Sequence, residues 1–451
     1  MRTKLSVDLR PLRHSRDLRL LYGGRAVSSL GSATAAVCAA LQVYDLSHSS
    51  LAVGAISVAG AGPMVAGMLV GGPLADGYDR RLLIAASQAL AGLAAAGLAC
   101  NALGSHSKLW LVFVLVALSG LVVGLGSPAR SAAVPTLVGP ELLSAAIALN
   151  STVYQVSNLV GPAVAGLVIA RFGFPVAYGA DAISFLFCAL MAARMRRLPP
   201  TQENERPGIS SFLEGVAYVR RNSLVIGLLL VDVDAMVFGM PRALFPALGT
   251  SVFHGGATVV GLLYTAPAVG ALLGAAAGGW IGRVRRSGPV LFGSVVVWGG
   301  AIAGFGLTSM LPLALVLLAV AGAGDFVSEV FRSTLLQLSV PNNLRGRVSA
   351  IWLAQANASP ALGNLEAGAV ANVTSPQFSV VSGGLACIAG ALVLARLLPT
   401  LRSIRSGTLA VDPSSPPGQR SAAEPRPVSY DNPQLDGTDP RRRPRHAMNT
   451  K

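Results

Sequence analysis

The chain has 451 residues, of which 52% are apolar and only 12% are charged. A soluble protein of this length carries about twice that share of charge, so the composition excludes a soluble globular chain. The net charge of +15 would indicate nucleic-acid binding in a soluble chain. Here the Lys and Arg residues gather at the ends of apolar runs, which predicts the lipid bilayer rather than nucleic acid as the partner.

The apolar runs are about 20 residues long, the length that a helix needs to cross roughly 30 Å of hydrocarbon. We therefore predict an all-α integral membrane protein with 12 transmembrane helices in two six-helix pseudo-repeats. The predicted spans are residues 19–43, 51–75, 82–104, 109–134, 143–170, 175–195, 223–248, 257–281, 288–308, 311–337, 347–372 and 377–399. The predicted domains are an N-terminal bundle at 1–197, a cytoplasmic linker with an amphipathic segment at 198–222, a C-terminal bundle at 223–400 and a disordered cytoplasmic tail at 401–451.

The basic residues also predict the orientation of the chain. Of the 35 Lys and Arg residues, only Lys108 and Arg171 fall in the loops on one side of the membrane. By the positive-inside rule, both termini are expected in the cytoplasm.

Residues 71–81 interrupt two long apolar runs with the charges of Asp76, Asp79, Arg80 and Arg81. Because this stretch is rich in Gly and Pro, we predict a tight turn at the membrane surface rather than a continued helix.

Two echoes near a 200-residue offset indicate an internal repeat. Residues 71–76 resemble 278–283, and residues 127–131 resemble 329–333. Parallel six-helix repeats with the ligand site between them are one known layout of secondary transporters.

The run Gly72-Pro73-Leu74-Ala75-Asp76-Gly77-Tyr78-Asp79-Arg80-Arg81 resembles the loop signature of the major facilitator superfamily, Gly-x-x-x-Asp-basic-x-Gly-basic-basic. Gly77 departs from it where a basic residue is usual, and Asp79 where Gly is usual. An Asp at that place is similar to the branch that contains the bacterial enterobactin exporter, and residues 127–135, 241–248 and 345–349 support that branch. The resemblance covers about residues 15–400. It implies an alternating-access exporter in the bacterial inner membrane.

Gly161 and Pro162 in the fifth span are similar to the Gly-Pro-rich pattern of superfamily exporters. The proline frees a backbone carbonyl and the glycine lets another helix approach closely, so a bend and a tight contact are expected. Simple helix packing is the alternative reading.

Ionisable side chains inside spans cost roughly 2.5 to 3.5 kcal/mol each on insertion scales, which makes them candidates for function. These are Arg25, Asp181, Asp232, Asp234, Arg242, Asp325, Glu329, Arg332 and Glu366. Glu329 and Arg332 are three residues apart and are expected to form a structural pair, whereas Asp325 is expected to lack that partner. Asp232 and Asp234 lie about 200° apart around a helix, so they cannot both face one cavity.

A carboxyl group in a low-dielectric cavity can bind a proton on one side of the membrane and release it on the other. We predict that Asp232 or Asp234, Asp325 and Glu366 supply the proton-coupling acid and polar contacts to substrate. Spans 1, 4, 7 and 10 are expected to face a central cavity. The basic residues expected there are Arg25, Arg130 and Arg242.

The sequence contains no catalytic motif and no metal-ligand spacing, so we predict no enzyme, no cofactor and no metal site. The expected function is secondary active export of a small amphipathic compound, siderophore-like or a drug, by proton antiport through a monomer. Alternatives are a multidrug efflux carrier, an importer, or a membrane sensor or scaffold that transports nothing.

The loop at 71–81 also suggests a latch. Asp76 is placed to meet Arg130 and the positive N-terminal end of the eleventh span near Val348, which would close the cytoplasmic side when the carrier faces outward. Under the alternative, the loop only anchors topology through Arg80 and Arg81.

Overall fold

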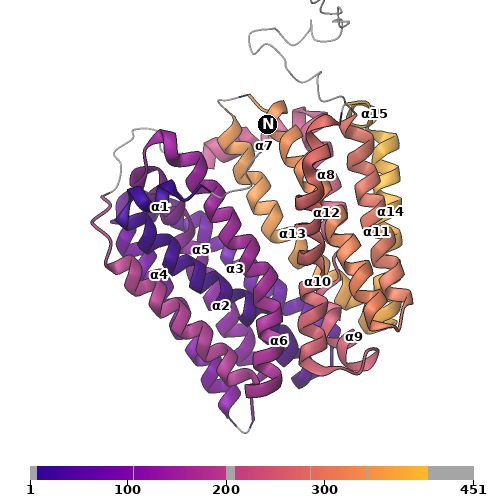
Figure 1. Cartoon of the computed structure of the whole chain (residues 1–451), viewed down its shortest axis with the longest axis horizontal. Coiled ribbons are helices and arrows are strands. Elements are labelled where there is room, and N and C mark those ends of the chain that lie inside the picture. The colour runs from indigo at the N-terminus through magenta and orange to yellow at the C-terminus, as the bar shows by residue number, and fades with distance from the viewer. Residues whose placement is uncertain (1–7, 105, 200–208, 285, 342–343, 405–451) are drawn as a thin grey trace, which may run out of the picture. The chain divides into compact units, whose positions relative to one another are not determined.

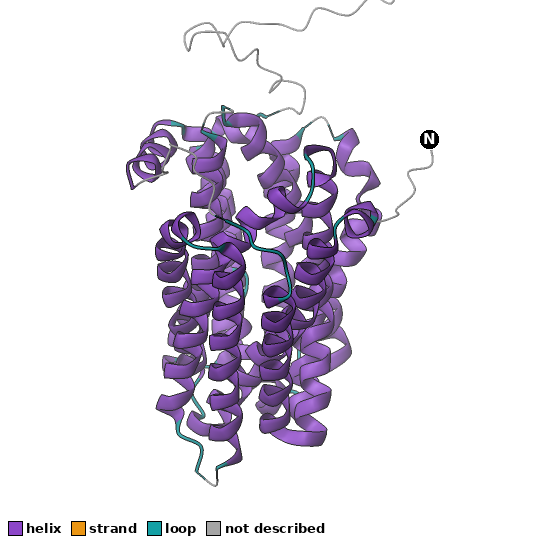
Figure 2. Ribbon diagram, turned by 90° about the vertical axis from the view of Figure 1, so that its left-hand side faces the viewer, coloured by secondary structure: helices purple, strands orange, loops and turns teal. Residues whose placement is uncertain are grey.

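The computed structural model describes residues 8–104, 106–199, 209–284, 286–341 and 344–404. In these residues all regular structure is helical and no strand is present (Figures 1 and 2). The described helices belong to one compact unit, Met1–Leu409. The predicted all-α class is therefore confirmed. Most of the tail predicted at 401–451 lies outside the described residues, and the predicted division into domains stays a prediction.

Every predicted span is helical, with one break in the seventh. The first group of helices is α1 (Arg10–His14), α2 (Arg16–Ser47), α3 (Ser50–Gly77), α4 (Arg80–Leu103), α5 (Leu109–Leu137) and α6 (Pro140–Ala193). The second group is α7 (Ile209–Arg221), α8 (Ser223–Phe238), α9 (Phe245–Ser251), α10 (Gly256–Ala277), α11 (Ser287–Leu307), α12 (Leu311–Ser339), α13 (Arg345–Val373), α14 (Pro376–Leu397) and α15 (Pro399–Arg402), with the 3-10 turns η1 (Arg242–Leu244) and η2 (Gly278–Arg283).

Ten helical segments of the described chain are long and apolar enough to cross a membrane. One of them, α6, runs through the fifth and sixth predicted spans. The two spans are separated within it at Gly173, which has φ 76° and breaks the helix just before Pro175. The segment α13 is not among the ten. Its apolar run is interrupted by the polar side chains Gln355, Asn357, Asn364 and Glu366.

The connection between α3 and α4 is shorter than the turn predicted at 71–81. Helix α3 continues through Pro73 to Gly77, and only Tyr78 and Asp79 separate it from α4. A proline removes a single backbone donor, and membrane helices tolerate this loss where neighbouring helices pack closely. Such packing is present here, since Gly71 lies directly against the backbone of α5 at Leu125.

Two long helix pairs join the first group of helices to the second: α3 packs along α13, and α6 packs along α10 (Figure 1). A carbon added at Gly54 would lie 2.3 Å from the carbonyl oxygen of Asn364, and one added at Gly261 would lie 2.9 Å from the Cα of Gly166. Such small residues allow backbones to approach closely. Both contacts lie toward the end of α3 that is opposite the loop at 71–81.

Candidate functional site

A cavity of about 500 Å³ lies between the two groups of helices. Residues of α2, α3 and α6 line one side, and residues of η1, α10, α12 and α13 line the other. Its polar lining consists of Ser57, Tyr154, Gln155, Asn158, Arg242, Tyr264, Asp325, Glu329 and Asn364. Of the residues predicted to face a central cavity, Arg242 and Asp325 do so, and the cavity also receives Glu329.

Arg242 reaches the cavity because the seventh span is broken. Between α8 and η1 the chain leaves the helix at Gly239 to Pro241. The indole Nε1 of Trp298 donates to the carbonyl of Gly239 at 2.8 Å, and the hydroxyl of Tyr264 donates to the carbonyl of Arg242 at 2.9 Å. Because the freed carbonyls are hydrogen-bonded, the break is a stable feature of the kind that forms transporter sites.

Asn364 of α13 connects this break to the first group of helices. Its Oδ1 accepts a hydrogen bond from the backbone nitrogen of Ala243 at 3.0 Å. Its Nδ2 donates to the hydroxyl of Ser57 in α3 at 3.2 Å. One side chain thus links the wall of the cavity formed by α3 to the wall formed by η1.

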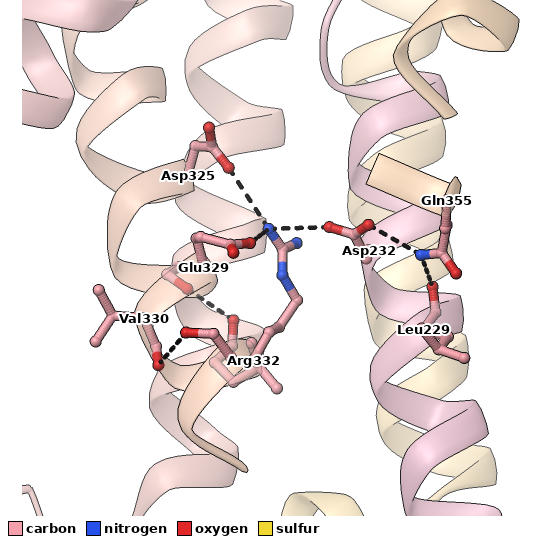
Figure 3. Close-up of polar contacts among 10 residues, drawn as sticks. Leu229, Asp232, Asp325, Glu329, Val330, Arg332 and Gln355 are labelled. Carbon is pink, nitrogen blue, oxygen red and sulfur yellow. Dashed lines mark hydrogen bonds and ion pairs between the residues drawn. The ribbon is translucent and has the colours of Figure 1, made fainter. Parts of the chain in front are cut away.

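Arg332 of α12 is the centre of an acidic cluster (Figure 3). Its side chain is 0% exposed, and its Nη2 lies 3.1 Å from Asp232 Oδ1, 3.6 Å from Asp325 Oδ1 and 3.0 Å from Glu329 Oε2. The expectation that Asp325 lacks this partner was therefore wrong. The arginine side chain is long enough to reach a carboxyl group two helical turns away.

Three carboxyl groups share the charge of one guanidinium in this cluster. If all three were ionised, the cluster would carry two negative charges in excess of Arg332, which is costly beside a low-dielectric interior. Binding of a proton by one of the acids would lower that cost. Asp325 and Glu329 also line the cavity, so a proton can reach them from water.

Asp232 lies on the far side of Arg332 from the cavity. Gln355 of α13 donates to Asp232 Oδ2 at 2.9 Å and to the carbonyl of Leu229 at 3.0 Å (Figure 3). The Asp232 side chain is only 3% exposed. Asp232 therefore holds Arg332 in place and does not line the cavity.

Three other acids inside the predicted spans also lie away from the cavity. Asp234 faces α14, where its Oδ1 lies 1.9 Å from the place that a Cβ on Gly390 would occupy, and its Oδ2 has no hydrogen-bond partner in the described chain. Glu366 is half-buried and does not line the cavity. Asp181 is buried between α6 and α2, where Ser184 donates to its Oδ1 at 3.3 Å.

Arg80 and Arg81, the first two residues of α4, bind backbone carbonyls at the ends of neighbouring helices. Arg80 donates to the carbonyls of Ala75 and Ala132 at 3.3 and 3.4 Å, and Arg81 donates to that of Met195 at 3.3 Å. These contacts hold the ends of α3 and α5 and the segment after α6 together.

The other residues predicted to act in gating do not join the ends of helices in this conformation. Asp76 is exposed and forms no ion pair with Arg130 within the part of the chain that is described. Gly72 has open space around it. Gly161 packs against Ala33 of α2, and Pro162 lines the cavity. The predicted roles of these residues in gating stay predictions.

Arg25 and Arg130 line a second cavity, of about 340 Å³, enclosed by α2, α5 and α6. The prediction that both arginines face the central cavity was wrong, and nothing in the sequence separates the two cavities. Tyr264 was not predicted, since its only signal is a hydroxyl inside an apolar span, and Arg332 was predicted to pair with Glu329 alone.

Comparison with known proteins agrees with this fold. The family model described as transmembrane secretion effector matches residues 6–417. A similar curated protein is the enterobactin exporter EntS of Shigella boydii, which is 30% identical over 387 residues, covering 86% of this chain and 93% of that protein.

Similar solved structures include a POT family transporter in complex with 5-aminolevulinic acid, with a TM-score of 0.69 and 12% identity, covering 86% of this chain and 97% of that one. Another is the nucleoside transporter NupG, with a TM-score of 0.68 and 12% identity over 84% and 99% of the two chains. At these identities the likeness concerns the fold alone.

Proposed function

The chain belongs to the transmembrane secretion effector family of the major facilitator superfamily, and from this premise we propose that it exports a small amphipathic, siderophore-like compound in exchange for protons. Membership makes it a multi-pass secondary transporter of a small molecule rather than an enzyme. The kind of substrate follows the name of the enterobactin exporter, to which the chain is similar. The proposed setting is the inner membrane of a bacterium, with both termini in the cytoplasm and the monomer as the working unit.

The observation that carries this proposal is the acidic cluster on the wall of the central cavity. A volume of about 500 Å³ suits one small organic molecule. Asp325 and Glu329 touch both the cavity and Arg332. A proton that binds to either acid releases its hold on the guanidinium, so protonation changes the charge that faces the substrate.

Transport then follows from alternating access between the two groups of helices. Substrate enters from the cytoplasm while the acids are unprotonated, and proton binding from the opposite side accompanies its release. The close contacts of α3 with α13 and of α6 with α10 must open on one side as the other side closes. The bond from Asn364 to Ser57 is one that must break during this change.

Uptake into inverted membrane vesicles tests this function, using enterobactin and several cationic dyes with and without an acid interior. We expect accumulation of enterobactin that depends on the pH gradient and is abolished by the proton–potassium exchanger nigericin. Accumulation of the dyes alone would assign the chain to multidrug efflux. Accumulation of neither would contradict transport of these compounds and favour a sensor.

We further propose that Asp76 is the cytoplasmic latch and that Gly72, Gly161 and Pro162 allow the helices to move. Asp76→Asn should leave insertion intact and raise thiol labelling of a cysteine introduced at Ser131 by several-fold. The exposed native Cys100 is first replaced by serine, since the other three cysteines are buried. Asp45→Asn is the matched control, because Asp45 is an exposed acid near the end of α2 that leads into the start of α3. Unchanged labelling would favour a loop that only anchors topology.

A further inference from the structure

The second cavity is lined by polar groups that donate hydrogen bonds. Besides apolar side chains, it exposes Arg25 of α2, Ser127, Arg130 and Ser131 of α5, and Asn150 of α6. The hydroxyl of Tyr22, which also lines it, already donates to the carbonyl of Ala146 at 2.9 Å. Among the described residues no carboxylate lines this cavity.

The two arginines have no acid to neutralise them. Neither Arg25 nor Arg130 forms an ion pair within the described ranges; Arg130 donates only to the carbonyl of Val123, at 3.3 Å. The Nε of Arg25 is buried and has no hydrogen-bond partner there. Two cations that face one cavity inside a bilayer repel each other, and an anion between them removes that cost.

In the second half of the repeat, the arginine that corresponds to Arg130 is surrounded by acids. Arg130 stands at the same distance from the start of α5 at Leu109 as Arg332 does from the start of α12 at Leu311. By the same alignment, Ser127 stands where α12 has Glu329. The place in the first half that corresponds to the acidic cluster therefore has the arginine but lacks the acid that corresponds to Glu329.

The first span also carries a positive charge where the seventh span carries an acid. Arg25 and Asp232 stand at equal distances from the starts of their helices, Arg16 of α2 and Ser223 of α8. A cation thus replaces the acid that neutralises Arg332 in the second half. One half presents acids along the pathway, and the other half presents two free guanidinium groups.

The second cavity and the central one follow each other along the same two helices. Helices α2 and α6 line both: on α2, Arg25 precedes Ala33, and on α6, Asn150 precedes Tyr154. The second cavity is nearer the loop at 71–81, which is the proposed cytoplasmic side. A compound that enters from that side meets the arginines before it reaches the acids.

We infer that the second cavity is an anion-binding subsite and that the exported compound carries a carboxylate, sulfonate or ionised phenol held between Arg25 and Arg130. This inference rests on the proposed function, because it takes the anion to be part of the transported compound. The fork of a guanidinium group binds a carboxylate through two parallel hydrogen bonds, and its N–H groups also donate to the oxygens of a sulfonate or an ionised phenol. The hydroxyl of Ser127 and the amide of Asn150 are further donors.

Equilibrium binding tests the subsite without any gradient or transport. The probes are two dyes with the same xanthene frame, anionic carboxyfluorescein and cationic rhodamine 6G, measured by fluorescence anisotropy on the full chain in phosphatidylcholine nanodiscs. We expect Arg25→Gln and Arg130→Gln each to weaken carboxyfluorescein binding by about tenfold or more and to leave rhodamine binding unchanged. Unchanged carboxyfluorescein binding in both variants, or equal loss for both dyes, would overturn the inference.

Further variants separate charge from structure. Arg25→Lys and Arg130→Lys, which keep the charge, should recover most of the affinity, whereas a merely structural role predicts no recovery. Arg171→Gln removes the same charge from an exposed site near the other end of the pathway and should have no effect. Binding that disappears in phosphatidylglycerol nanodiscs would assign the subsite to a lipid headgroup and overturn the inference for substrate.

The outcomes remain distinguishable from those of the vesicle experiment. Arginine-dependent binding of the anionic dye without gradient-driven enterobactin uptake would contradict the proposed transport and leave the anion subsite supported. Gradient-driven uptake together with dye binding that does not depend on the arginines would support the proposed transport and contradict the anion subsite.

Discussion

Replacing Arg332 by glutamine is expected to abolish transport and to lower the free energy of unfolding by about 3–5 kcal/mol. The side chain is fully buried, and its charge is shared by Asp232, Asp325 and Glu329. Without it, Asp232 would be left with the hydrogen bond from Gln355 alone. Denaturant unfolding in detergent micelles measures the stability, and vesicle uptake measures the activity.

A double variant separates the two effects of Arg332. Asp232→Leu with Arg332→Met replaces the buried ion pair by apolar side chains, and such replacements are often neutral or stabilising. We expect this variant to regain most of the lost stability and none of the transport, because Asp325 and Glu329 would still face the cavity without a guanidinium. Full activity in either variant would contradict a role for Arg332 in coupling.

A second arginine serves as the control for stability. Arg347 of α13 pairs with Glu214 of α7, and both side chains are partly exposed. Pairs of this kind contribute about 0–1 kcal/mol, so Arg347→Gln should change the free energy of unfolding little. A loss as large as that of Arg332→Gln would show that the assay responds to any missing arginine.

The fold could be predicted from apolar length because lipid offers no hydrogen bonds to the backbone. A run of about 20 apolar residues must therefore be helical, whatever its neighbours are. The details of Gly and Pro were harder to predict. Pro73 lies within α3, whereas Gly239 and Pro241 break the seventh span. The two cases differ in their packing, and packing is decided by residues that are distant in sequence.

Only part of the site could be predicted, because its contacts also depend on residues that are distant in sequence. Helical periodicity correctly placed Asp232 and Asp234 on different faces, and the structure shows them facing α12 and α14 respectively. Periodicity says nothing about which helix lies opposite each face. The contact between Asp232 and Arg332 joins residues a hundred positions apart. The spacing within α12 alone could suggest only the pair of Glu329 with Arg332.

The two cavities differ in the charged groups that line them, and this links the proposed anion subsite to the proposed proton site. Arg25 and Arg130 are free of acids in the described chain, whereas Asp325 and Glu329 share one guanidinium. A compound whose anionic group is held by Arg25 and Arg130 could donate hydrogen bonds from its other end to ionised Asp325 and Glu329. Protonation of either acid would weaken those bonds, so proton and substrate would compete, as exchange requires.

Asp325→Asn is expected to abolish accumulation driven by a pH gradient while leaving exchange of substrate between equal pools intact. Among the three acids around Arg332, Asp325 lies farthest from the guanidinium, at 3.6 Å, and its Oδ1 has no hydrogen-bond partner in the described residues. Protonation of Asp325 therefore weakens the interactions of Arg332 less than protonation of either other acid would. An amide in its place keeps the shape of the neutral acid and cannot release a proton.

Two vesicle measurements on the same variant decide this role for Asp325. Uptake against a concentration gradient needs the proton cycle. Asp325→Asn should therefore reduce this uptake by at least about tenfold at every pH difference across the membrane. Counterflow of labelled against unlabelled substrate needs only alternating access, and the neutral amide should sustain it. Glu366→Gln removes an acid that does not line the cavity and should keep both activities. Gradient-driven accumulation in Asp325→Asn would assign the proton to Glu329 instead, because Glu329 is the other acid that meets both the cavity and Arg332.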